Sequence, residues 1–131
     1  MAFVQRLIDD CAGKMRIYYA VQQRPENFIN ATADVIAQAI LARFAVAGQA
    51  RAVVFYDGLA RSKEVEVGAR IRRHGLTLEH VRGIADDHEP LIRVADAICG
   101  LIRKSYEGNV AMRALAQQAI KRGLLVDLNE A

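Results

Sequence analysis

The sequence predicts an α/β protein in which helices cover a mostly parallel sheet. Segments with helical spacing alternate with short apolar segments, in the order α, β, α, β, α, β, α, α. The apolar run from Arg51 to Tyr56 is unbroken and rich in β-branched and aromatic residues, which is typical of a central strand covered on both faces. Because crossovers between parallel strands share one hand, the three strands would share a carboxyl edge.

Length and composition favour one folded domain. The chain has 131 residues, of which 53% are hydrophobic and 25% charged, and it contains no low-complexity tract. Cys11 and Cys99 lack metal-ligand spacing and are expected to be reduced core thiols. Residues 1–10 do not resemble a signal peptide, and no run reaches the ~18 apolar residues of a membrane span, so a cytoplasmic location is expected.

The first half of the chain predicts a helix, a strand and a second helix. Apolar residues recur at helical spacing over residues 2–11, and residues 15–22 alternate as in a strand near a sheet edge. Asn27 is the expected N-cap of a long helix over residues 28–46. The expected buried stripe of that helix is Phe28, Thr32, Val35, Ile36, Ala39, Ile40 and Phe44.

Asp57 directly follows the predicted central strand. A charged residue there would lie at the carboxyl edge of the sheet, where open α/β folds bind ligands. Ser62 is the expected N-cap of a helix over residues 63–74, and residues 76–81 alternate as a third strand. The sequence after that strand brings Asp86 and Asp87 to the same edge.

Two helices are predicted in the last third. One begins near residues 88–90, behind Asp86 and Asp87, and its expected inward face is Leu91, Val94, Ala95, Ile98, Leu101 and Ile102. Asp96 falls at the boundary of that face. Asn109 is the expected cap of the last helix, residues 110–122, and residues 124–128 are expected to form a docked tail.

The run Asp86-Asp87, a proline, then Leu91-Ile-Arg-Val-Ala-Asp-Ala-Ile-Cys-Gly100 resembles the closing motif of the domain-of-unknown-function 3800 family, whose members resemble RNase H-like nucleases. Asp96 and Gly100 match the family pattern, while Arg93 stands at the position of its glutamine. The resemblance covers about residues 14–106. It implies a truncated RNase H-like three-layer fold, because the opening strand with its Asp-Glu-Ser signature is missing from this sequence.

This resemblance implies catalytic and metal-binding roles for Asp57, Asp87 and Asp96. Converging carboxylates suit Mg²⁺ or Mn²⁺, which take oxygen ligands. Asp86 and His88 are supporting candidates, and His88 could move a proton near a metal-bound water. The alternative stays open: Asp57 would begin a turn, Asp86 or Asp87 would cap a helix, and Asp96 would pair with an arginine in solvent.

Basic residues cluster in two segments, although the net charge is only +3. They are either solvated helix faces or a surface that tracks phosphates. The candidates for nucleic-acid contact are Arg61, Lys63, Arg70, Arg73, Arg103 and Lys104.

Two classes of function follow from the sequence. The first is a metal-dependent nuclease-like hydrolase that acts on nucleic-acid phosphodiesters. The second is a non-catalytic RNase H-like module that binds protein or nucleic acid or forms a homodimer, because missing strands leave sheet edges open. If the chain forms a homodimer, residues 2–11 or 15–22 are the expected contact.

Overall fold

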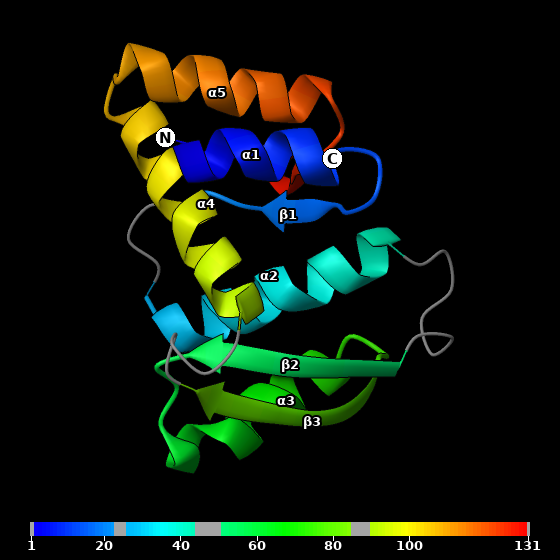
Figure 1. Cartoon of the computed structure of the whole chain (residues 1–131). Coiled ribbons are helices and arrows are strands. Elements are labelled where there is room, and N and C mark those ends of the chain that lie inside the picture. The colour runs from blue at the N-terminus through cyan, green and yellow to red at the C-terminus, as the bar shows by residue number, and fades with distance from the viewer. Residues whose placement is uncertain (1, 23–25, 44–50, 85–89, 131) are drawn as a thin grey trace. The chain divides into compact units, whose positions relative to one another are not determined.

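The computed structural model describes residues 2–22, 26–43, 51–84 and 90–130, which fall into two compact units. The terminal unit combines residues 1–19 with residues 93–131, and the central unit comprises residues 20–92. Each contains helices and two short parallel strands (Figure 1), so the α/β class is confirmed. The single domain expected from the sequence stays a prediction.

The central unit is built on a β-α-β segment. Strand β2 (Arg51–Asp57) runs parallel to β3 (Thr77–Ile84), and the chain between them forms a 3-10 turn, η1 (Arg61–Lys63), and helix α3 (Glu64–Arg72). The register pairs Arg51 with Thr77 and Asp57 with Ile84, with one irregularity between Ala52 and Val53. Both strands therefore end at the same edge.

Helices α2 (Phe28–Arg43) and α3 cover one face of this sheet. Their contact lets apolar side chains from both helices and both strands form one core, because every second strand residue points to the same face. The buried members of this core are Ala33, Ala37, Val54, Leu59, Val67, Ile71, Leu76, Leu78 and Val81.

The prediction that β2 is a central strand covered on both faces is wrong. Val54 is buried, but its neighbours Val53 and Phe55 are 42% and 38% exposed. In the described part of the chain β2 pairs only with β3, and the helices cover only the face that carries Val54. An unbroken apolar run does not reveal this difference, because both faces of the strand carry apolar residues.

The predicted stripe of α2 is also partly wrong. Ala33 and Ala37 are fully buried, whereas Phe28 is 70% exposed, and Phe44 lies outside the described residues. The helix is apolar around most of its circumference, so periodicity alone did not select the buried face. Two buried alanines one turn apart allow α2 to lie close to its neighbours. The predicted cap is confirmed, because the Asn27 side chain accepts a hydrogen bond of 3.0 Å from the backbone N–H of Asn30.

Strands β1 (Ile17–Tyr19) and β4 (Leu125–Asp127) form a separate parallel pair in the terminal unit. The expectation that the strand at residues 15–22 shares a sheet with β2 and β3 is therefore wrong. Its partner is the C-terminal tail, which the sequence predicted to dock but not to form a strand. Leu124 and Leu125 are almost fully buried, and this burial favours the pairing over a solvated tail.

Three helices accompany that pair: α1 (Ala2–Cys11), α4 (Pro90–Tyr106) and α5 (Val110–Lys121). The amphipathic pattern of α1 is confirmed, because Val4, Leu7 and Ile8 are buried. The cap of α5 is confirmed too, since the Asn109 side chain accepts from the Met112 N–H at 3.0 Å. In the described residues, no helix is long and apolar enough to cross a bilayer.

Three other expectations from the sequence need correction. Ser62 does not cap α3 but lies within η1, and the N-cap residue, Lys63, makes no side-chain capping bond. Leu91 was expected on the inward face of α4 but is 58% exposed. The neighbouring Ile92 is buried instead. Cys99 is exposed rather than part of a core.

Candidate functional site

Asp57 lies at the carboxyl end of β2, as the sequence predicted. It is exposed and aligned with Ile84, the last residue of β3. The next residue turns the chain: Gly58 has φ +73° and donates its N–H to the carbonyl oxygen of Ile84 at 3.0 Å. Glycine reaches this left-handed conformation without the strain that a Cβ would add. The backbone of Asp57 thus lies next to the end of β3.

Three of the predicted site residues, Asp86, Asp87 and His88, fall outside the described residues. They follow Ile84 by two to four positions in the sequence. Among the residues that the structure describes, no group of three or more His, Cys, Asp or Glu side chains could hold a metal ion.

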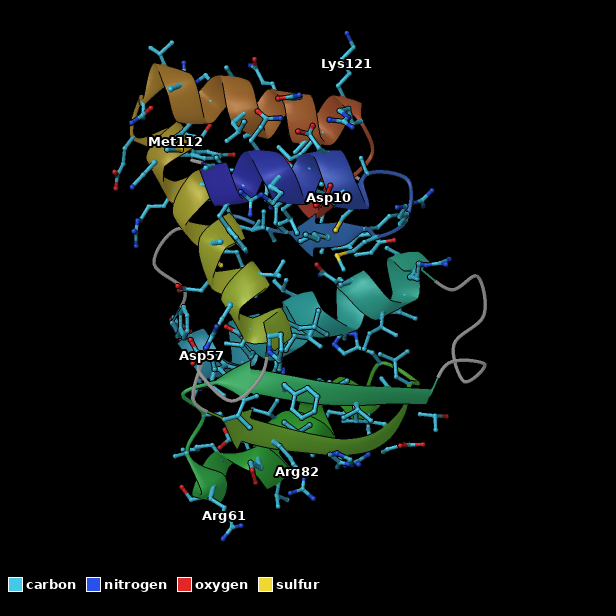
Figure 2. The ribbon with its side chains drawn as sticks, in the orientation of Figure 1. Asp10, Asp57, Arg61, Arg82, Met112 and Lys121 are labelled. Carbon is cyan, nitrogen blue, oxygen red and sulfur yellow. The ribbon has the colours of Figure 1, made fainter. Side chains whose placement is uncertain are left out.

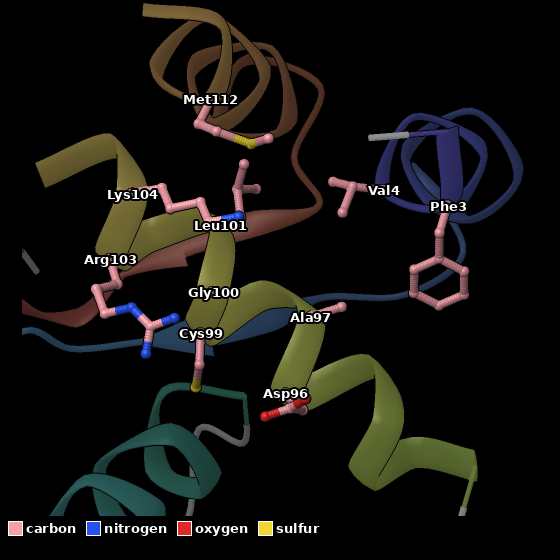
Figure 3. Close-up of a pocket in the computed structure, with 10 residues that line it drawn as sticks. All are labelled: Phe3, Val4, Asp96, Ala97, Cys99, Gly100, Leu101, Arg103, Lys104 and Met112. Atoms are coloured by element: carbon pink, nitrogen blue, oxygen red, sulfur yellow. The ribbon is translucent and has the colours of Figure 1, made fainter. Parts of the chain in front are cut away.

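Asp96 lines a cavity of about 360 Å³ in the terminal unit (Figure 3). The cavity wall is formed by α1, α4 and the first turn of α5, and two predicted cations, Arg103 and Lys104, line it as well. Its other lining residues are Phe3, Val4, Ala97, Cys99, Gly100, Leu101 and Met112. The structure therefore brings together three residues that the sequence singled out for two different roles, one as a metal ligand and two as phosphate contacts.

The two sides of this cavity differ in chemistry. In Figure 3, Asp96, Cys99 and Arg103 lie along one side of α4, which their spacing of three and four residues explains. The Lys104 side chain is separate from them and ends beside Leu101 in this view. Gly100 also lines the cavity, and a Cβ added there would meet no atom within 4 Å. A polar strip of α4 therefore faces open space beside an apolar wall.

Cys99 is poorly suited to act as a nucleophile in this cavity. Although Cys99 is exposed as a residue, desolvation of its sulfur raises the pKa of the thiol; the charge of Asp96 raises it further, while Arg103 lowers it. The thiol therefore stays protonated at neutral pH, and the thiolate is the reactive form. Cys99 contributes shape to the cavity rather than chemistry.

The predicted phosphate contacts of the central unit have different surroundings. Arg61 and Arg73 are exposed. Lys63 forms an ion pair with Glu66 at 3.3 Å, and Arg70 donates two hydrogen bonds to Asp34. The guanidinium of Arg70 is thus engaged in joining α3 to α2.

Sequence reasoning missed the face of the β2–β3 sheet that the described helices leave accessible, here called the open face. It carries Val53 and Phe55 from β2 beside His80 and Arg82 from β3, because the register aligns Val53 with His80 and Phe55 with Arg82. A signal was available in β3, where polar residues at positions 80 and 82 flank the buried Val81. Aligned residues of parallel strands point to the same side, so the neighbouring face of β2 had to be accessible too.

Comparison with known proteins gives no match: no protein-family model, curated protein or solved structure is significantly similar to this chain.

Proposed function

We propose that this chain is a divalent-metal-dependent, nuclease-like hydrolase of nucleic-acid phosphodiesters with an RNase H-like fold. The observation that carries the proposal is the shared cavity of Asp96, Arg103 and Lys104. A carboxylate beside two cations suits a phosphodiester bound together with a metal ion, since the carboxylate attracts the metal and the cations attract the phosphate oxygens. The exposed position of Asp57 at the end of β2 also supports a ligand role.

In this proposal the carboxylates of Asp57, Asp87 and Asp96 hold Mg²⁺ or Mn²⁺, which both prefer oxygen ligands. When bound, the ion supplies a nucleophilic water and stabilises the leaving oxygen. Asp86 and His88 assist, with His88 taking the proton that the attacking water loses. One P–O bond forms to the water oxygen, one P–O bond breaks, and the departing oxygen receives a proton.

Arginine and lysine would position the strand rather than react. Arg103 can contact a phosphate with two N–H groups, while Lys104 acts as a point charge. Arg61, Lys63, Arg70 and Arg73 of the central unit are proposed to contact nucleic acid as well, with Arg61 and Arg73 contributing most because they are exposed. The departures from the family pattern, Arg93 and the missing acidic strand, lead us to expect weak Mn²⁺ binding and little or no nuclease turnover from this chain alone.

The test combines calorimetric titration with Mn²⁺ and cleavage of single-stranded DNA and RNA. Asp96→Asn should weaken Mn²⁺ binding by at least about tenfold and reduce cleavage with it. Asp10→Asn is the matched control, since Asp10 is an exposed carboxylate of α1 that is absent from the cavity wall (Figure 2). Metal-dependent cleavage that survives Asp96→Asn would overturn the proposal.

The second candidate is a non-catalytic module that forms a homodimer. It is favoured by the β1–β4 pair, a two-stranded sheet to which no further strand is added in the described residues. The backbone groups at the edge of a short sheet can pair with another chain. Under this alternative, sedimentation velocity at high micromolar concentration shows a dimer, and the wild type binds no Mn²⁺; a monomer at that concentration would exclude it.

A further inference from the structure

The open face of the central unit combines an exposed aromatic ring with cationic neighbours. Phe55 is 38% exposed and Val53 is 42% exposed, although both are apolar and lie in the middle of a strand. Arg82 is aligned with Phe55 across the parallel pair, and His80 is aligned with Val53. All four residues are exposed and lie on one face of the sheet, with Arg82 in register with Phe55.

We propose that this open face is a platform for single-stranded nucleic acid, on which Phe55 stacks against an unpaired base. Bases stack on exposed aromatic rings whatever their sequence, and cations beside the ring hold the phosphate backbone. Arg82 and His80 supply hydrogen-bond donors at the platform, and Arg61 of η1 adds a further exposed charge in the same unit (Figure 2). The platform deepens the proposed function, because it names the form of the substrate.

The order of Phe55 and Asp57 along β2 also supports a bound single strand. Phe55 lies two residues before Asp57, the proposed metal ligand at the carboxyl end of the same strand. Alternate residues of a strand share a face, and two residues span about 7 Å, close to the length of one extended nucleotide. A base stacked on Phe55 would leave its neighbouring phosphate within reach of the Asp57 end. The acidic Asp57 and Glu79 oppose binding of a bare phosphate, so the platform depends on stacking more than on charge.

A second copy of this chain fits the open face less well. A stable interface buries about 800 Å² on each partner, far more than two half-exposed side chains offer. Duplex nucleic acid fits poorly too, because its bases are already stacked and paired.

The experiment measures fluorescence anisotropy of a labelled single-stranded oligothymidylate of roughly 12 nucleotides, a length typical of such sites. EDTA is present, so binding is measured without metal or cleavage. Phe55→Leu should weaken binding about 5- to 150-fold, since it keeps an apolar side chain but removes the stacking ring. Phe55→Tyr keeps an aromatic ring and should bind with an affinity within about twofold of the wild type.

Two controls separate stacking from general effects. Phe28→Leu changes an equally aromatic and more exposed residue of α2 and should leave affinity unchanged. Arg82→Gln should reduce the slope of log affinity against log salt by about 0.7, as expected for one lost phosphate contact on a single strand. Arg6→Gln, a matched exposed charge on α1, should leave the slope unchanged. Thermal melting of each variant verifies that it is folded.

The platform and the proposed function can fail separately. Oligonucleotide binding is measured in EDTA, without metal, so loss of Mn²⁺ binding and cleavage in Asp96→Asn tests the proposed function alone. Unchanged affinity of folded Phe55→Leu, or no binding by the wild type at low salt, overturns the platform. A wild-type dimer that Phe55→Leu dissociates would also overturn it, because the open face would then hold a second copy.

Discussion

The guanidinium of Arg70 on α3 donates two hydrogen bonds, of 3.0 and 2.9 Å, to the two carboxylate oxygens of Asp34 on α2. The ring nitrogen Nε2 of His74 also lies 3.1 Å from Oδ1 of the same carboxylate. These hydrogen bonds hold the pKa of Asp34 at about 2, below its ordinary 3.8, with Arg70 as the main cause. The pair joins the two helices that cover the β2–β3 sheet.

This pair predicts a stability that depends on acid pH. Because the pKa of Asp34 is lower in the folded chain, the pair stabilises fully above pH 3.8 and is lost as the pH falls toward about 2. We expect Asp34→Asn to cost about 1 kcal/mol at pH 7 and almost nothing at pH 2, since the pair is partly exposed. Urea unfolding at both pH values measures this difference. An equal effect of Asp34→Asn at both pH values would contradict it.

Two neighbouring valines of β2 predict opposite responses to the same substitution. Val54→Asp buries a charge without a partner, which costs several kcal/mol and should abolish cooperative folding. Val53→Asp places the same charge on the open face, where Val53 is 42% exposed, and should cost about 1 kcal/mol or less. Solubility and thermal melting compare the two. A Val54→Asp protein that melts cooperatively would contradict the placement of β2.

Two glycines predict opposite effects of a single added methyl group. A Cβ added at Gly83 of β3 would collide with the carbonyl oxygen of Leu59. The backbone N–H of Gly83 also donates a hydrogen bond of 3.2 Å to the Glu64 carboxylate. Gly83→Ala should therefore destabilise the chain by about 3 kcal/mol, because backbone rather than a flexible side chain must shift. Gly100→Ala should instead stabilise it by about 1 kcal/mol, since α4 leaves open space there. Chemical denaturation of both variants tests the contrast.

Tyr56 predicts a stabilising substitution. Its hydroxyl is buried, and among the described residues no hydrogen-bond partner is found for it, although the ring packs against the core of the central unit. Burying an unpaired hydroxyl costs about 1–3 kcal/mol, so Tyr56→Phe should raise stability by about 1 kcal/mol, or the melting temperature by about 3–5 °C. Tyr106→Phe is the control, because Tyr106 is 65% exposed and its hydroxyl can bond to water. A lower melting temperature for Tyr56→Phe would show that the hydroxyl has a partner.

Local features of this chain were predictable from its sequence. Asn27 and Asn109 cap their helices as expected, because a cap needs only a side chain and the N–H groups of the following turn. The amphipathic helix α1 and the position of Asp57 at the carboxyl end of its strand were also predictable from short-range patterns. Asp96, Arg103 and Lys104 were singled out one by one from composition and from resemblance.

Tertiary structure decided which of these features meet. Val53 and Val54 look alike in sequence, and only the helices packed on one side of β2 make one exposed and the other buried. The pairing of Ile17 with Leu125 joins residues from opposite ends of the chain, and local periodicity carries no information about such partners. Asp96, Arg103 and Lys104 share one helix, but the cavity that they line has the same long-range origin, because α1 and α5 complete its walls. Sequence thus determined the helices, the strand that ends at Asp57 and the residue chemistry, while long-range packing decided which tail forms a strand, which faces are covered and which walls enclose the cavity.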